Sequence, residues 1–259
     1  MNPSKHRYMP ALWFTLALIP IALVGGFFTV RYQFDLYPPE MMDEIEAQLG
    51  SVGLLYIISL LQTVIYAMFC GFIGYLMADS LGLIKPFKPT AKPLLFTAAI
   101  SVAGGAALAL LDTFVFAPAV GEEAILGSVD ALLSLDGWIA SLLYGGIIEE
   151  VMLRLFFLSL LAWIIRKLFY RHTPIEDVPV WIFIVANVVS ALLFAAGHLP
   201  ATEMTFGALT PVLLIRCFLL NGSLGMGFGW LYRKYGIGYA MLAHAGAHIV
   251  NKILFMVVL

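Results

Sequence analysis

The sequence predicts an all-α fold, a polytopic membrane bundle with seven to eight transmembrane helices. Hydrophobic residues make up 62% of the chain and charged residues only 12%. Soluble domains carry about 25% charged and about 45–50% apolar residues, so this composition is that of a membrane protein. Seven apolar runs are each long enough to cross a bilayer, which needs about 20 apolar residues.

The predicted spans are apolar runs separated by charged or proline-containing loops, at residues 9–30, 52–78, 94–115, 137–170, 180–199, 209–232 and 237–259. The fourth run is too long for one simple span. A break at Gly145-Gly146 would leave a short half-helix before the rest of that run and raise the count from seven to eight. Between the first two spans, Pro38-Pro39 and an acidic amphipathic piece predict a short interfacial helix.

Loop charge predicts the orientation, because cytoplasmic loops carry an excess of Lys and Arg. Basic residues lie at the N-terminus and in the even loops: Lys5, Arg7, Lys85, Lys88, Lys92, Arg166, Lys167, Arg171, Arg233 and Lys234. Acidic residues lie in the first and third loops: Asp35, Glu40, Asp43, Glu44, Glu46, Glu122, Glu123, Asp130 and Asp136. We therefore expect a cytoplasmic N-terminus. The short chain, without long cytosolic extensions, favours a prokaryotic cell membrane.

Composition also bounds the partners. The net charge of −2 argues against nucleic acid as a partner. Cys70 and Cys217 lie in apolar runs, which favours packing over a disulfide or a thiolate metal site. No repeat or soluble domain is evident, so we expect residues 1–259 to form one membrane domain. We also expect that the protein requires no cofactor.

Two adjacent acids, Glu149-Glu150, lie inside the fourth apolar run. Ionised carboxylates in hydrocarbon cost about 2.5–3.5 kcal/mol each on insertion scales, so an intramembrane pair indicates a functional polar site. Glu150 and Arg154 are four residues apart and share a helix face, which predicts an ion pair. Glu149 is rotated by about 100° from its neighbour and stays free for chemistry.

The later spans carry further polar stripes. Asn187, Ser190 and His198 follow helical spacing on the fifth span, and His244, His248 and Asn251 follow it on the last. Polar groups in such helices must face the bundle interior or water, which predicts one shared cavity. Straight spans, however, would put His198 and His244 near opposite membrane surfaces, with Glu149 between them.

In order and spacing, Glu149-Glu150-x-x-x-Arg154, Phe194-x-x-x-His198 and His244-x-x-x-His248 resemble the motifs of the CPBP family, which comprises CAAX prenyl proteases and bacteriocin-processing Abi proteins. The resemblance covers residues 137–251, whereas residues 1–136 carry no such motif. The last motif departs from the family pattern HxxxN: His248 stands where the family has asparagine, and Asn251 follows one turn further along the same face.

The resemblance implies an intramembrane endopeptidase that uses glutamate as the base. Peptide hydrolysis needs an activated water, oxyanion donors and a proton for the leaving amine. We expect Glu149 and His198 to activate the water, and His244 with His248 or Asn251 to stabilise the oxyanion. The substrate would be a membrane-associated peptide or protein, with or without a lipid. Glu and two His also suit catalytic zinc, so a metal-dependent variant stays open, although no HExxH motif is present.

Other interpretations remain beside the peptidase. Glu150 and Arg154 fit a purely structural pair. A non-catalytic membrane scaffold or peptide-binding protein could use the same cavity. A proton or ion transporter is a third class, but no inverted repeat supports it. The Gly222, Gly225, Gly227 and Gly229 series is typical of close helix packing. Asp112 and Arg216 receive no role from the sequence.

Overall fold

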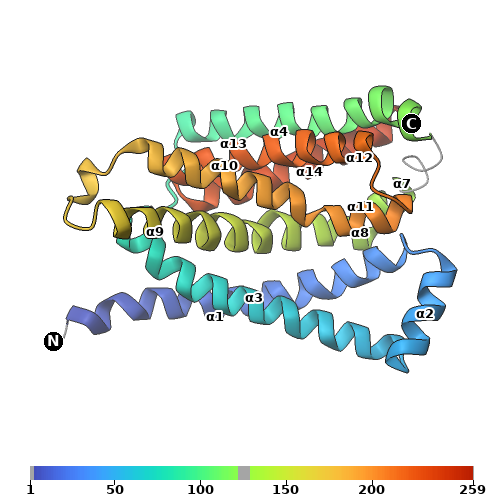
Figure 1. The fold of residues 1–259 in the computed structure, drawn as a ribbon, viewed down its shortest axis with the longest axis horizontal. Coiled ribbons are helices and arrows are strands. Elements are labelled where there is room, and N and C mark those ends of the chain that lie inside the picture. The colour runs from blue at the N-terminus through green and yellow to red at the C-terminus, as the bar shows by residue number, and fades with distance from the viewer. Residues whose placement is uncertain (1–2, 122–128, 259) are drawn as a thin grey trace.

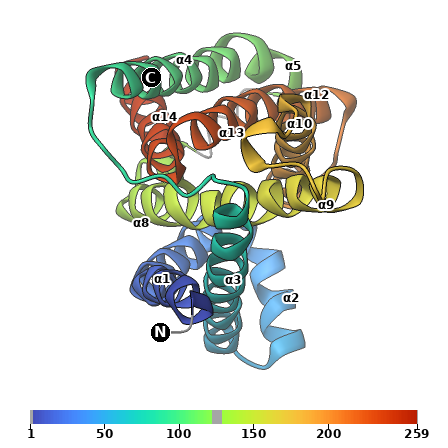
Figure 2. The ribbon, with the colours of Figure 1, turned by 90° about the vertical axis from the view of Figure 1, so that its left-hand side faces the viewer.

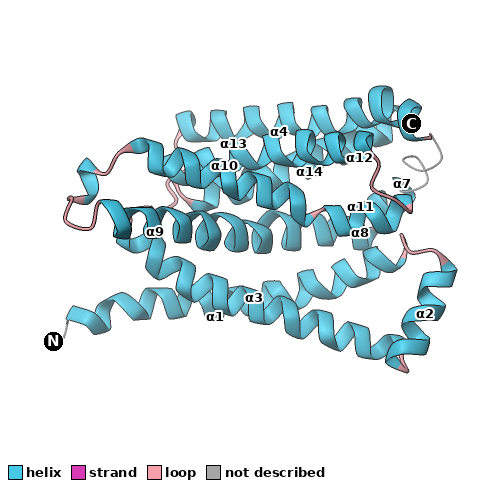
Figure 3. Cartoon of the chain, in the orientation of Figure 1, coloured by secondary structure: helices cyan, strands magenta, loops and turns pink. Residues whose placement is uncertain are grey.

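The computed structural model describes residues 3–121 and 129–258, and all regular elements in them are helical, which confirms the predicted all-α class (Figure 3). The elements are α1 (Pro3–Phe34), α2 (Pro39–Leu49), α3 (Val52–Ser80), α4 (Ala91–Leu111), η1 (Asp112–Phe116), α5 (Ala117–Val120), α7 (Val129–Leu133), α8 (Leu135–Ile139), η2 (Ala140–Glu149), η3 (Val151–Leu158), α9 (Ser159–Phe169), η4 (Ile175–Asp177), α10 (Val180–Gly197), α11 (Leu199–Phe206), α12 (Pro211–Cys217), η5 (Phe218–Gly222), α13 (Ser223–Tyr235) and α14 (Ile237–Val258). The predicted acids Glu122 and Glu123 lie outside the described residues.

Six helical runs of the described residues are long and apolar enough to span a membrane: Tyr8–Phe34, Val52–Ser80, Ala91–Val120, Val180–Phe206, Pro211–Tyr235 and Ile237–Val257. Large apolar side chains such as Leu61 and Leu95 are exposed on them, as expected for lipid-facing surface. A further continuous helical run, α8 to α9, occupies the place of the predicted fourth span. The predicted count of seven to eight spans is therefore approximately right.

The predicted break at Gly145-Gly146 is wrong, because both glycines lie inside η2. They serve a close helix approach instead. A Cβ added to Gly146 would lie 2.9 Å from the Cβ of Ala245 in α14, and one on Gly145 would lie 3.0 Å from Nε2 of His248. η2 and η3 are π-helical, with wider turns than an α-helix, and such segments are frequent at functional sites.

The predicted short helix between the first two spans is present as α2. Gly50 ends it in the left-handed region, at φ 75°, where glycine meets no steric penalty. Its N–H donates to the carbonyl of Glu46 at 2.8 Å. Ser51 then caps α3 by accepting from the N–H of Leu54, so the chain reverses sharply into the next span.

The helices form two groups joined by the α8–α9 run. α1, α2 and α3 lie together on one side, and α4, α10, α13 and α14 lie on the other (Figures 1 and 2). The α8–α9 run packs against both groups, since η2 contacts α1 and α14, and η3 contacts α3 and α10. The predicted acids are therefore carried by the most central helix of the bundle.

α14 is held against α4 by small residues. A Cβ on Gly105 of α4 would lie 2.5 Å from the carbonyl oxygen of Ala247, and Ser101 donates to the carbonyl of Ala243 at 3.2 Å. Small residues let helix backbones approach closely in membranes, where packing rather than the hydrophobic effect joins helices. A helix without a sequence motif thus fixes the position of the helix that carries His244.

Charge separates the two ends of the bundle. Lys85, in the loop after α3, donates to the backbone carbonyls of Arg233 and Lys234, so the second and sixth loops lie at the same end. Burial, and then the charges of Arg233 and Lys234, lower the pKa of Lys85. The N-terminus lies at this end too, on the left in Figure 1, whereas α2 and α11 lie at the opposite end. We call these the basic end and the acidic end.

The α4–α14 packing predicts that Gly105→Val destabilises the protein. The added side chain must displace the backbone of Ala247, and overpacking typically costs about 1–3 kcal/mol. We expect a clearly lower Tm for detergent-purified protein. Ala103→Val on the exposed face of the same helix is the matched control and should leave Tm unchanged. Equal Tm values for the two variants would contradict this account of the packing.

Candidate active site

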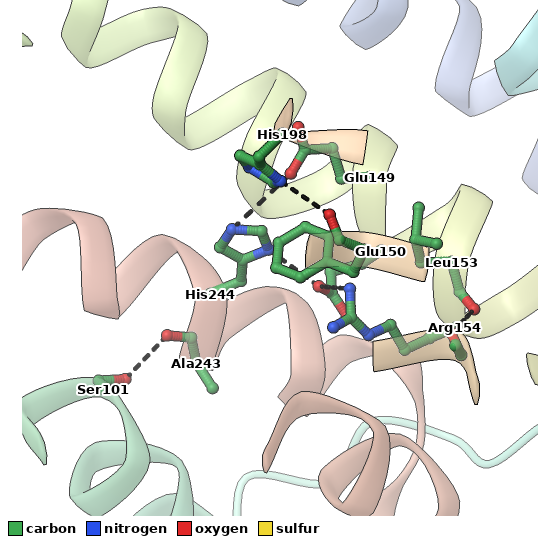
Figure 4. Close-up of polar contacts among 10 residues, drawn as sticks. Ser101, Glu149, Glu150, Leu153, Arg154, His198, Ala243 and His244 are labelled. Carbon is green, nitrogen blue, oxygen red and sulfur yellow. Dashed lines mark hydrogen bonds and ion pairs between the residues drawn. The ribbon is translucent and has the colours of Figure 1, made fainter. Parts of the chain in front are cut away.

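The buried core of the site is a carboxylate shared by a guanidinium and an imidazole. Arg154 Nη1 donates to Glu150 Oε1 at 2.9 Å, which confirms the predicted ion pair, and both side chains are completely buried. His244 Nδ1, from α14, approaches the same oxygen at 2.8 Å (Figure 4). Charge-assisted hydrogen bonds of this kind are about twice as strong as neutral ones. Glu150 therefore ties the last helix to the central helix.

Two aromatic rings hold Arg154. Its guanidinium carbon lies 4.5 Å from the ring centroid of Phe194 and 5.4 Å from that of Phe228, both within cation–π range. Gly225 leaves the space for it, because a Cβ there would lie 2.9 Å from Nη2. Arg154 Nε and Nη2 have no hydrogen-bond partner among the described residues. The aromatic faces supply the remaining stabilisation of this charge.

His244 lies between the two acids. Its ring stacks on Phe228 with centroids 4.6 Å apart and meets the edge of Phe194 at 5.5 Å. Nε2 lies 3.9 Å from Glu149 Oε2, beyond direct hydrogen-bond distance. Because an ionised Glu150 can only accept, Nδ1 carries a proton, and Nε2 of the neutral ring is an acceptor that faces Glu149.

Glu149 has a different environment from its neighbour. Its side chain is 21% exposed, against 0% for Glu150. It lines a cavity of about 500 Å³ together with His198, His248 and Asn251. Three of the polar spans therefore meet in one hollow, as the helical spacing predicted, and Figure 4 shows Glu149 and His198 beside each other.

His198 is oriented by the backbone of its own helix. Its Nδ1 donates to the carbonyl of Phe194 at 2.8 Å, so Nε2 of the neutral ring is left as an acceptor. The ring of Phe194 contacts this imidazole as well, in a T-shaped arrangement with 4.8 Å between centroids. Phe194 thus contacts Arg154, His198 and His244, which explains its place in the spacing with His198. The expected difference in depth between His198 and His244 does not occur.

The last helix contributes His248 and Asn251. His248 stacks on His244 at 5.0 Å and reaches the cavity beside Gly145, whose lack of a Cβ leaves room for its Nε2. Asn251 is largely buried, and its Oδ1 has no hydrogen-bond partner among the described residues. Lys252 points elsewhere: it donates to the carbonyl of Leu132 and lies over the ring of Trp138.

Two residues of the predicted fifth-span stripe do not reach the cavity. Ser190 donates to the carbonyl of Leu153 at 2.7 Å, and Asn187 donates to that of Met226 at 3.0 Å. Both are helix-packing contacts. A Cβ on Gly229 would overlap the Asn187 amide, which supports the predicted packing role of that glycine.

The cavity wall also includes residues that the sequence did not single out. Arg216 lines it and makes a bidentate ion pair with Asp112, at 2.7 and 2.5 Å. The sequence showed two opposite charges on separate spans, but it did not show that these two residues lie close together in the fold. Thr29 and Tyr32 of α1 contribute to the wall as well. The helices without a motif therefore help to form the candidate site.

Within residues 3–121 and 129–258, no three His, Cys, Asp or Glu side chains converge as a metal site requires. Glu149 and His244 approach each other. However, Nδ1 of His244 is already hydrogen-bonded to Glu150, and Nδ1 of His198 to the Phe194 carbonyl.

Part of the chain matches a protein-family model. Residues 131–250 match the model of the family described as Type II CAAX prenyl endopeptidase Rce1-like. The matched segment contains Glu149, Glu150, Arg154, His198, His244 and His248, and ends one residue before Asn251. No curated protein and no solved structure matches the chain.

The shared carboxylate predicts that Arg154→Met strongly destabilises the protein. Removing one partner of a buried pair leaves an uncompensated charge and typically costs about 3–5 kcal/mol. We expect a large loss of Tm in detergent, with partial recovery in the double variant Arg154→Met with Glu150→Gln. Glu149→Gln is the control, because that carboxylate faces the cavity. A double variant less stable than Arg154→Met alone would refute the pairing argument.

Proposed function

We propose that this integral membrane protein hydrolyses a peptide bond with Glu149 as the base, because residues 131–250 match the Rce1-like family of type II CAAX prenyl endopeptidases. The observation that carries the proposal is the contrast between the two adjacent acids. Glu150 is paired with Arg154 and His244, whereas Glu149 faces the cavity. The family supports a membrane peptidase in general, and the residue roles are our proposal.

Water activation falls to Glu149 with His198. A water in the cavity between them can donate to the Glu149 carboxylate and to Nε2 of His198, whose Nδ1 proton is held by the Phe194 carbonyl. As the water attacks the scissile carbonyl carbon, its proton passes to this pair. The pair then returns the proton to the leaving amine when the C–N bond breaks.

The oxyanion needs donors on the opposite side of the scissile carbonyl. We predicted His244 with His248 or Asn251, and the contacts favour the last two. Neutral His244 uses its Nδ1 proton for Glu150, so it can donate from Nε2 only when the ring is doubly protonated. His248 and Asn251 both line the cavity without such a commitment. His244 then serves to hold Glu150 in place.

A membrane-associated peptide or protein is the proposed substrate. The cavity lies among lipid-exposed helices, which suits a hydrophobic or lipidated peptide. We propose a prokaryotic cell membrane as the location, with the N-terminus in the cytoplasm, because the basic loops gather at the end that holds the N-terminus.

The proposal predicts that Glu149→Gln abolishes peptide cleavage without unfolding the protein. Loss of a general base typically lowers the rate by about 10²–10⁴-fold. We expect turnover to fall by this range in detergent, with Tm unchanged. The assay compares prenylated and unprenylated peptides of equal sequence. Glu203→Gln is the matched control, since Glu203 is exposed on α11.

The same variant separates catalysis from binding. If the protein is a non-catalytic scaffold or peptide-binding protein, wild type cleaves no peptide, and Glu149→Gln keeps its peptide affinity because the substitution is nearly isosteric. If wild type cleaves and Glu149→Gln cleaves equally well, the glutamate mechanism is wrong while the peptidase class stands.

The metal-dependent alternative gives a separate prediction. Glutamate-type hydrolysis needs only protein groups and water, so a strong chelator should leave turnover unchanged. The purified protein is dialysed against the chelator, assayed, and assayed again after zinc is restored. Loss of activity on chelation with recovery on zinc addition would replace our mechanism with a zinc-dependent one.

A further inference from the structure

From Glu149 the cavity extends mainly toward the acidic end, and Met152 and Leu153 of η3 are its only lining residues on the other side of Glu149 in the central helix. Its wall is built from the acidic-end parts of the helices: Thr29, Tyr32, Gln33 and Leu36 near the end of α1, Ser141 and Tyr144 of η2, and Thr202, Thr205 and Phe206 of α11. These segments lie toward the right in Figure 1, on the side of α2 and α11. No residue of α9, of α13 or of the loop after α3 lines it.

The opposite direction is closed by packed side chains. Between Glu149 and the basic end, Leu155, Leu158 and Ala162 of the central helix are fully buried, as are Leu231 and Tyr232 of α13. The hydroxyl groups of Ser159 and Tyr232 hydrogen-bond at 2.7 Å inside this packed region. Dense packing of this kind leaves no path for a peptide from the basic end.

The Lys and Arg residues are distributed just as unequally between the two ends. The chain has 14 Lys and Arg residues. Ten of them belong to the basic end: Lys5, Arg7, Lys85, Lys88, Lys92, Arg166, Lys167, Arg171, Arg233 and Lys234. Arg154 is buried in the site. The remaining three lie in the acidic-end half of the bundle.

Each of these three cations is used within the protein. Arg31 donates to Asp136 at 2.7 Å, and Arg216 makes its bidentate pair with Asp112. Lys252 donates to the Leu132 carbonyl over the Trp138 ring. None is therefore available to attract the anionic cytoplasmic leaflet, whereas the acidic-end loops add exposed carboxylates such as Asp43, Glu44 and Glu46.

We propose that the cavity opens to the extracytoplasmic side, so that substrates enter from the outer leaflet or the space beyond it. That a substrate enters the cavity rests on the proposed peptidase function. The side from which it enters is inferred from the loop charges and the cavity wall. The rule that basic loops stay in the cytoplasm puts the basic end inside. The direction in which most of the cavity extends then leads outward. The substrate class is a peptide anchored in, or delivered to, the extracytoplasmic leaflet.

Cysteine labelling tests the side of access. In a chain with Cys70→Ala and Cys217→Ser, single cysteines are placed at Thr205 in the cavity wall, at Glu44 of the acidic end and at Lys88 of the basic end. A membrane-impermeant maleimide is added to intact cells that express each variant, and to inverted membrane vesicles from the same cells. Cys217→Ser is chosen because a hydroxyl can replace the thiol that donates to the Ala195 carbonyl.

We expect Thr205→Cys and Glu44→Cys to be labelled on intact cells, and Lys88→Cys only in inverted vesicles. Labelling of Thr205→Cys solely in inverted vesicles, or on neither side, overturns the proposal, as does labelling of Glu44→Cys solely in inverted vesicles. Cleavage by wild type and by Glu149→Gln is measured separately. A failed peptidase with the expected labelling refutes the function alone, and an active peptidase with reversed labelling refutes the side alone.

Discussion

The architecture of the site depends on one buried oxygen, Oε1 of Glu150, which accepts from Arg154 and His244 at the same time. A carboxylate and a guanidinium in a nonpolar interior are costly to desolvate, and only good geometry with additional hydrogen bonds offsets this cost. The imidazole supplies one such bond from another helix. Phe194 and Phe228 enclose the guanidinium from two further helices. A single charge pair thereby determines how four helices meet.

This arrangement gives the two neighbouring acids different chemistry. Successive side chains of a helix point in different directions, so Glu150 enters the packed interior while Glu149 reaches the cavity. His244 touches both environments, with Nδ1 on the structural acid and Nε2 toward the free one. The proton on Nδ1 is then fixed by the structural acid, which leaves the face toward Glu149 as an acceptor. The position of Glu150 and the protonation of His244 are therefore coupled through one hydrogen bond.

Much of this was accessible from the sequence, because helical spacing and hydropathy act over short range. The i,i+4 spacing predicted the Glu150–Arg154 pair, and the apolar runs predicted the membrane bundle. Long-range contacts were not accessible. Gly145-Gly146 looked like a break because the helix that approaches them is about 100 residues away in sequence. Asn187 and Ser190 share a face with His198, yet their side chains donate to backbone carbonyls of neighbouring helices instead of reaching the cavity.

The contacts between the matched residues 131–250 and the preceding helices have a further consequence. Within that segment, α14 leans on α4 through Ser101 and Gly105, and Asp136 is tied to Arg31 of α1. Both partners lie outside residues 131–250. A fragment trimmed to the matched residues would expose the small residues of this face of α14, such as Gly246 and Ala247, to lipid, which does not reproduce the close packing of α4. We therefore expect residues 131–250 to be inseparable from the preceding helices, so that grafting this segment onto another scaffold would require transplanting those helices too.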